Sequence, residues 1–171
     1  MSCQSSVVND GYESKIFSRF TPDSYRDHDS RLNCRMFLSE TKVRVRYAET
    51  DQMGIVYHSN FFLYYEVARA ESIRHLGYTY ADMEKMGVIM PVVEVQSRFL
   101  RPALYDELLT IKTILKELPA HHKIEFHHEV YNEKEELLVT GKVILYFMEA
   151  KTMKRTTMPE QLLGKIKPYF D

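Results

Sequence analysis

Residues 44–69 read RVRYAETDQMGIVYHSNFFLYYEVAR, and this stretch decides the fold. At its upstream end, residues 41–48 alternate Val43, Val45 and Tyr47 with basic residues. A period of two is typical of a strand with one buried face. A strand is therefore expected to lead into the loop that follows.

The hydrophobic period changes after His58. Apolar residues then recur at steps of three and four as far as Leu76, which predicts a helix of about four to five turns. Ser59 or Asn60 is expected to cap the start of this helix, and Gly77 to end it. The stretch therefore predicts a strand, a polar loop and a largely apolar helix in succession.

The polar loop joins a carboxylate, Asp51, to the helix start near His58. The first turn of a helix has unpaired N–H groups and the positive end of the helix dipole, so it can hold an oxyanion. A nearby carboxylate can act as a nucleophile or as a general base for water. The alternative is a structural role, because an aspartate before a helix often belongs to a turn or cap.

The loop and helix start carry the pattern Tyr-x-x-Thr-Asp-x-x-Gly-x-Val-Tyr-His-x-x-Tyr/Phe. Its members here are Tyr47, Thr50, Asp51, Gly54, Val56, Tyr57, His58 and Phe61. The pattern resembles the motif of hotdog-fold acyl-CoA thioesterases of the 4-hydroxybenzoyl-CoA thioesterase type and of their Tol-Pal-associated relatives. Similarity continues through residues 66–69 and 99–106, and covers roughly residues 42–163.

The resemblance implies an α+β hotdog fold, in which a five-stranded antiparallel sheet wraps around one long central helix. It also implies hydrolysis of acyl-CoA thioesters to free acid and CoA, without a cofactor or a metal. In that family the carboxylate at the position of Asp51 is catalytic, and the amide at the position of His58 binds the thioester oxygen. We assign substrate contact to Tyr47, Gly54, Val56, Tyr57, Glu66, Arg98 and Arg101.

The rest of the chain agrees with an α+β order. Strands are expected at residues 88–100, 107–118, 122–131 and 136–149. A capped short helix at residues 79–85 and a final helix that reaches Ile166 are expected as well; Thr157, Pro159 and Glu160 mark the start of the latter. The last strand is apolar on both faces, which favours contact of one face with another subunit in a homo-dimer or homo-tetramer.

Length and composition fit one domain that binds a small molecule. The chain has 171 residues, 44% of them hydrophobic, and a formal net charge of −1, which offers no general attraction to nucleic acid or to an anionic membrane. Residues 1–35 are polar, show no clear period and contain no apolar stretch suited to a signal peptide or membrane anchor. We interpret 1–35 as an N-terminal extension, 36–171 as the thioesterase domain, and Cys3 and Cys34 as free thiols in a cytoplasmic protein.

Several other residues invite a functional hypothesis. The pairs His121-His122 and His127-His128 suggest a metal site, but neighbours in a strand point to opposite faces, which argues against one. Glu66 is a second candidate carboxylate, with an ion pair to Arg69 as its structural alternative. Further basic candidates for the CoA phosphates are Lys123, Lys151, Lys154 and Arg155.

Two other functions stay open. A hotdog hydratase or dehydratase needs an acid–base pair around Cα and Cβ of the substrate, whereas Asp51 and His58 flank an oxyanion site. A non-catalytic acyl-CoA-binding protein would not need the carboxylate. Release of free CoA thiol separates the first alternative from hydrolysis, and binding without turnover would indicate the second.

Overall fold

The structure, a computed structural model, describes residues 35–171. The predictions about Cys3 and Cys34, and almost all of the extension at residues 1–35, therefore lie outside the described residues. In chain order the elements are β1 (Phe37–Arg44), η1 (Tyr47–Glu49), α2 (Asn60–His75), α3 (Tyr80–Lys85), β2 (Val88–Ile89), β3 (Val92–Phe99), β4 (Leu108–Leu115), β5 (Lys123–Tyr131), β6 (Leu137–Tyr146), β7 (Met148–Glu149), α4 (Glu160–Ile166) and η2 (Lys167–Tyr169).

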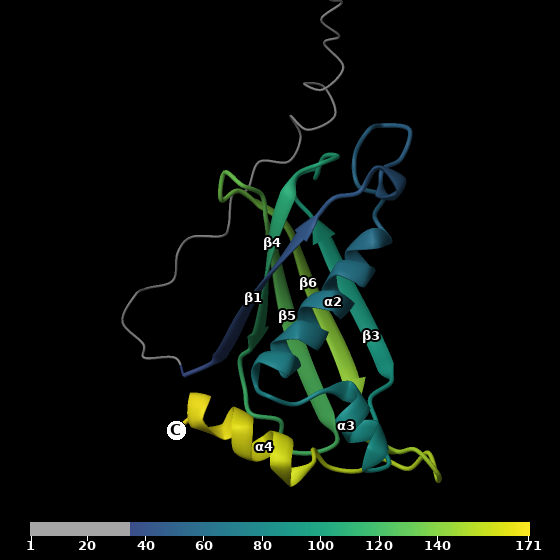
Figure 1. Ribbon diagram of the computed structural model, residues 1–171, viewed down its shortest axis with the longest axis vertical. Helices are drawn as coiled ribbons and strands as arrows, with labels where there is room; N and C mark the ends of the chain where they lie inside the picture. Colours follow the sequence, from purple (N-terminus) through teal and green to yellow (C-terminus); the bar gives the residue numbers. More distant parts are fainter. Residues whose placement is uncertain (1–34) are drawn as a thin grey trace, which may run out of the picture. The chain divides into compact units, whose positions relative to one another are not determined.

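Five strands form one sheet in the order β1-β4-β5-β6-β3, and every neighbouring pair is antiparallel. The helix α2 lies across one face of this sheet (Figure 1). The strands β4 and β5 alternate buried and half-exposed residues, as their sequence predicted. The loop before α2 lies toward one end of the sheet, and the short helices α3 and α4 lie toward the other end (Figure 1).

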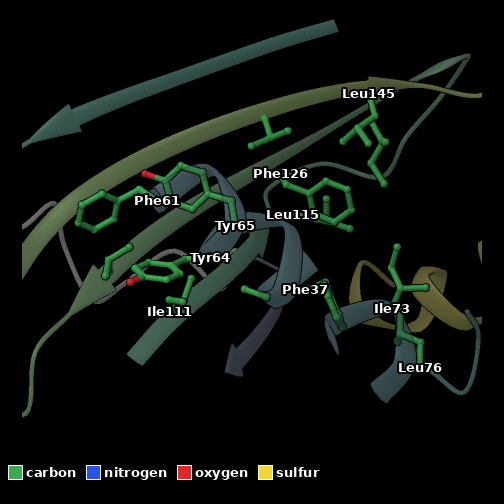
Figure 2. Close-up of a cluster of buried hydrophobic side chains, with 14 of the residues drawn as sticks. Phe37, Phe61, Tyr64, Tyr65, Ile73, Leu76, Ile111, Leu115, Phe126 and Leu145 are labelled. Atoms are coloured by element: carbon green, nitrogen blue, oxygen red, sulfur yellow. The ribbon is translucent and has the colours of Figure 1, made fainter. Parts of the chain in front are cut away.

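The core fills the space between α2 and the sheet. Figure 2 shows Phe61, Tyr64 and Tyr65 of α2 among the apolar side chains of the sheet. All three are buried, and Tyr65 is fully so. Its ring lies directly over Gly141 of β6, where an added Cβ would come within 2.5 Å of the ring. A glycine is therefore required here, because the backbone and the ring approach too closely for any side chain.

The first strand differs from its prediction. It runs over Phe37–Arg44 instead of residues 41–48, and Tyr47, expected on its buried face, is 79% exposed. The chain leaves the sheet because the Glu49 carboxylate accepts a hydrogen bond from the Arg46 N–H at 2.8 Å and closes the turn η1. Alternation could not reveal this bond, which depends on a side chain three residues ahead.

The helix ends agree in part with the sequence. Gly77 and Gly87 have φ values of +70° and +79°, as expected of residues that terminate helices. The start of α3 has the predicted capping box between Thr79 and Asp82. Ser59 holds the predicted N-cap position of α2 but makes no side-chain capping bond, and Pro159 rather than Thr157 holds the N-cap position of α4.

Both faces of β6 are buried within the chain. Leu138 and Val139 are adjacent in the strand, and each is at most 1% exposed; Ile144 is 6% exposed. The carbonyl of Leu138 accepts hydrogen bonds from the N–H groups of Leu100 and Arg101, which extends the pairing of β3 along the edge of this part of the strand. The two-sided apolar pattern is thus explained by contacts within one chain.

Candidate active site

The loop that carries Asp51 is a small hairpin. Thr50 and Val56 face each other in an antiparallel bridge, and the Asp51 N–H donates to the Ile55 carbonyl at 2.9 Å. At the tip, the Gly54 N–H donates to the Asp51 carbonyl at 2.9 Å. Gly54 has a φ of +74°, a conformation that glycine adopts without steric cost. The turn therefore presents the Asp51 side chain from a fixed backbone.

The Asp51 carboxylate is half-buried and held at one oxygen. Its Oδ1 accepts a hydrogen bond from the Met53 N–H at 2.8 Å. Within residues 35–171 its other oxygen, Oδ2, has no hydrogen-bond partner or ion pair. This arrangement fixes the side chain while one oxygen stays available for chemistry. The same bond is also the one that a purely structural turn aspartate would make.

The start of α2 has free hydrogen-bond donors. The N–H groups of Asn60 and Phe62 donate to the carbonyls of Tyr57 and Ser59. The N–H groups of His58 and Ser59 have no acceptor in the part of the chain that the structure describes. These two donors lie at the positive end of a 16-residue helix, where a negative oxygen is stabilised.

A distant segment, residues 99–106, supports the loop. The Val56 N–H donates to the Ala103 carbonyl at 2.8 Å, and Ile55 forms a bridge with Leu104. The His58 ring lies 6.5 Å from that of Phe99, and the Tyr47 ring lies 5.7 Å from that of Tyr105. The two stretches with family resemblance are thus brought together in space.

The sequence did not single out Glu49, which is only 5% exposed. Its carboxylate accepts hydrogen bonds from the Arg46 N–H and guanidinium, and from the Tyr64 hydroxyl at 2.8 Å. Burial alone would raise the pKa of Glu49, but the bonds from Arg46 and Tyr64 outweigh it and lower the pKa. A glutamate within a short polar segment is expected to be exposed. The only sequence signal for its buried role was its position three residues after Arg46 in a turn.

The residues that the sequence assigned to substrate contact differ from one another in exposure and in position. Tyr57 is exposed beside His58, and the rings of the two lie 4.3 Å apart. Val56, in contrast, is 4% exposed and belongs to the core. Arg98 and Arg101 lie at the end of β3 and just after it; both are exposed, and Arg101 donates to the Leu137 carbonyl.

The predicted ion pair between Glu66 and Arg69 is wrong. Glu66 is exposed on α2, whereas Arg69 is buried and donates from Nε to the Tyr80 hydroxyl at 2.7 Å. The side chain of Arg69 turns toward α3, where that hydroxyl offers a half-buried acceptor. No ion pair to Glu66 is present among the described residues.

The histidines of β5 have partners other than a metal. His128 is buried; its ring stacks on that of Tyr65 at 4.7 Å, and its Nδ1 lies 3.3 Å from the Thr113 hydroxyl. His127 lies 3.1 Å from the Glu125 carboxylate. Over residues 35–171, no three side chains of His, Cys, Asp or Glu gather in a way that would hold a metal ion.

None of the helices within residues 35–171 is both long and apolar enough to cross a membrane.

The fold and the site define a class of protein. The sequence model of the thioesterase-like superfamily matches residues 45–166. This match spans the hairpin loop, α2 and most of the sheet, and it covers well over half of the chain. The protein therefore belongs to the thioesterase-like superfamily.

Particular relatives are similar over most of their own length. The chain is 40% identical over 104 residues to Bacillus subtilis YneP, provisionally named an acyl-CoA thioesterase; the match covers 61% of this chain and 75% of YneP. It is 27% identical over 125 residues to YbgC of Escherichia coli O6:H1, named an acyl-CoA thioester hydrolase, with 73% and 92% covered.

A solved structure is similar in fold and sequence. The crystal structure of DHNA-CoA thioesterase from Staphylococcus aureus matches with a TM-score of 0.71 and 34% identity, covering 77% of this chain and 91% of that one. The predictions of an α+β hotdog fold and of membership in the acyl-CoA thioesterase family are confirmed.

Proposed function

We propose that Asp51 and the start of α2 together hydrolyse acyl-CoA thioesters to a free acid and CoA. The reaction is that of the family and of the named relatives. The assignment of roles to residues is our own. The observation that carries it is the hairpin that holds Asp51 and leads into α2 through His58 and Ser59, whose N–H groups have no acceptor among the described residues.

The N–H groups of His58 and Ser59 would receive the thioester carbonyl oxygen. Negative charge develops on this oxygen as the carbonyl carbon is attacked, and fixed donors stabilise that charge more in the transition state than in the ground state. The positive end of the helix dipole acts in the same direction. The His58 imidazole is exposed and is not required in this step.

Asp51 would act in the attack on the thioester in one of two ways. As a nucleophile, its carboxylate attacks the carbonyl carbon and expels the CoA thiolate; water then cleaves the resulting anhydride and restores the carboxylate. As a general base, it takes a proton from a water molecule that attacks instead. Both routes consume one water and yield the acid and the thiol, and neither requires a metal or a redox cofactor.

The CoA phosphates call for basic side chains near the site. Arg98 and Arg101 are exposed near the segment that packs on the loop, so we assign them to this role. Two of the other basic candidates are less suitable. Lys123 is paired with Glu125 at 2.7 Å, and Arg155 lies over the ring of Tyr146.

We place a second copy of the chain on the outer side of α2 and on the edge strand β3, in a homo-dimer or a homo-tetramer. Exposed apolar residues gather on these two elements: Phe62, Leu63, Val67, Val92, Val93 and Phe99. Among residues 35–171, no strand pairs with the outer edge of β3, which makes it suited to strand pairing. Light scattering at micromolar concentration should give at least twice the chain mass, and a monomer would contradict the assembly.

The boundary at Met36 and a cytoplasmic location belong to the same proposal. The sheet begins at Phe37, so a chain that starts at Met36 should fold and keep its hydrolytic activity. Thermal unfolding and thiol release compare this shortened chain with the chain of 171 residues. Loss of either property would make residues 1–35 part of the domain.

The test is a panel of acyl-CoAs of short, long and aromatic acyl groups, assayed with a thiol reagent. Hydrolysis predicts stoichiometric release of free CoA thiol and of the acid. A hydratase or dehydratase would change the acyl chain without releasing thiol. Binding of several acyl-CoAs without turnover would favour the non-catalytic alternative. Either of the last two results would overturn the proposed function.

A further inference from the structure

Glu49 contacts both ends of the hairpin and the first two turns of α2. Its backbone carbonyl accepts hydrogen bonds from the Tyr57 N–H at 2.9 Å and from Asn60 Nδ2 at 2.7 Å. The first bond joins the two ends of the hairpin that carries Asp51. The second joins the hairpin to the first residue of α2. Both bonds lie within two residues of the unpaired N–H of His58.

The side chain of Glu49 reaches the other way. One oxygen, Oε2, accepts from the Arg46 N–H and from the Tyr64 hydroxyl, each at 2.8 Å; the other, Oε1, accepts from the Arg46 guanidinium. Tyr64 lies in the second turn of α2 and is 2% exposed. The carboxylate therefore ties the end of β1 to a buried point on the helix.

Burial of a carboxylate costs free energy, and this cost is offset only when the oxygens of the carboxylate are hydrogen-bonded. The hydroxyl of Tyr64 remains a donor, because burial and the bond to Glu49 both raise the pKa of Tyr64. The Arg46 side chain is 75% exposed, so its ion pair adds little by itself. The bonds that fix geometry are those from the Arg46 N–H and from Tyr64.

We propose that Glu49 is a positioning residue for the hydrolysis, holding Asp51 and the N–H groups at the start of α2 at a fixed separation. The proposal rests on the function proposed above. Glu49 touches neither substrate nor reacting atoms. It acts through the hairpin, whose two ends it joins, and through α2, whose first and second turns it contacts.

The expected effect is on turnover. Displacement of a reacting group by about 1 Å can cost about 100-fold in rate. Glu49→Gln keeps the size of the side chain, but its amide places N–H groups against the donors of Arg46. We expect kcat to fall by about 10- to 100-fold, while KM changes by less than about threefold because the substrate contacts remain.

A second variant keeps the proposal testable if Glu49→Gln folds poorly. Tyr64→Phe removes one donor and keeps the buried ring. Its kcat should fall by about three- to tenfold, because the Arg46 N–H still holds Oε2. The double variant should lose less than the product of the two single losses, since both substitutions break the same link.

The matched control is Glu125→Gln. Glu125 is also a hydrogen-bonded glutamate, paired with Lys123 and His127, but it lies opposite Ile144 near the far end of β6. Its kcat should stay within about twofold of the wild type, as expected of an independent site. A kcat for Glu49→Gln equal to that of this control, or a loss confined to KM, would overturn the positioning role.

Asp51→Asn and the wild type complete the series and separate the two proposals. Thiol release by the wild type, its loss in Asp51→Asn and an unchanged kcat in Glu49→Gln would overturn the role of Glu49 alone. Wild-type protein that releases no thiol from any acyl-CoA would overturn both proposals.

Discussion

Two adjacent tyrosines of α2 enter two different buried polar clusters. Tyr64 donates to Glu49 in the loop cluster, which also contains Arg46. Tyr65 enters the sheet cluster, formed with Ser97, Thr113 and His128: its hydroxyl lies 3.0 Å from that of Ser97, and its ring stacks on that of His128. One residue along the helix thus separates a cluster beside the candidate site from one in the middle of the sheet.

The two clusters differ in charge and in how fully they are hydrogen-bonded. The loop cluster holds an ionised carboxylate with a donor at each oxygen. The sheet cluster is neutral: burial, followed by the nearby charge of Arg69, lowers the pKa of His128 to about 3. The Nε2 of His128 is buried without a partner in the described residues. The charged cluster thus lies where the backbone segments of the loop are joined, whereas the cluster within the sheet combines neutral hydrogen bonds with ring stacking.

The largest expected effect comes from breaking the packing of the sheet cluster. Gly141→Ala would place a Cβ within 2.5 Å of the fully buried Tyr65 ring. We expect a loss of about 3 kcal/mol in the free energy of unfolding, because the ring has no space into which to move. Denaturant titration measures this loss.

Gly164→Ala is the matched control. Gly164 lies in α4, where an added Cβ meets no atom within 4 Å. Alanine should stabilise this helix by about 0.5–1 kcal/mol. Equal stability of the two variants would contradict the close packing of Tyr65 on Gly141.

A smaller effect is expected from pH. The pKa of His128 is about 3 in the folded protein and near its ordinary value of 6.5 in the unfolded chain. Between these values the unfolded chain binds the proton and the folded protein does not. The contribution to stability is therefore complete above about pH 6.5 and is lost as the pH falls toward 3. By about pH 4.5 the loss should reach about 2–3 kcal/mol.

His128→Phe isolates this effect, because the carboxylates of the wild type remain while the imidazole is removed. Unfolding free energies of both proteins are measured from pH 7 to pH 4.5. The unfolding free energy of the wild type should fall relative to that of His128→Phe as the pH falls, since only the wild type must keep an imidazole neutral. Parallel curves would show that His128 titrates normally.

The smallest expected effect on stability comes from removal of a single tyrosine hydroxyl, and the kinetics of the two variants distinguish Tyr64 from Tyr65. Tyr65→Phe removes the bond to Ser97 and should cost about 1 kcal/mol of stability without lowering kcat. Tyr64→Phe should lower kcat, because its hydroxyl is linked to the loop. Similar kinetics for the two variants would remove the distinction between the loop cluster and the sheet cluster.

Much of the fold followed from periodicity. Local sequence patterns predicted the alternation of buried residues in β4 and β5, the length of α2, and the two glycines, Gly77 and Gly87, that end helices. The structure has each of these features where it was predicted. The family motif indicated Asp51 and His58 as one site. The structure adds that the hairpin between them is closed by hydrogen bonds and that the N–H of His58 has no acceptor within residues 35–171.

The parts that were wrong or missed depend on tertiary contacts. The alternation of Val43, Val45 and Tyr47 could not show that Glu49 turns the chain out of the sheet. The pattern of β6 could not show that its second face is covered by the same chain. In both cases the structure depends on a contact with a side chain or segment that the local sequence pattern does not reveal.

The most direct test of the account compares kcat for Asp51→Asn and Glu66→Gln with a good acyl-CoA substrate. Asparagine retains an oxygen that can accept from the Met53 N–H, so the turn should persist while the negative charge is lost. We predict that kcat falls by about 10²–10⁴ for Asp51→Asn if the group is a general base, and by much less for Glu66→Gln. A larger loss for Glu66→Gln, or a wild-type kcat for Asp51→Asn, would contradict the assignment of the chemistry to the loop.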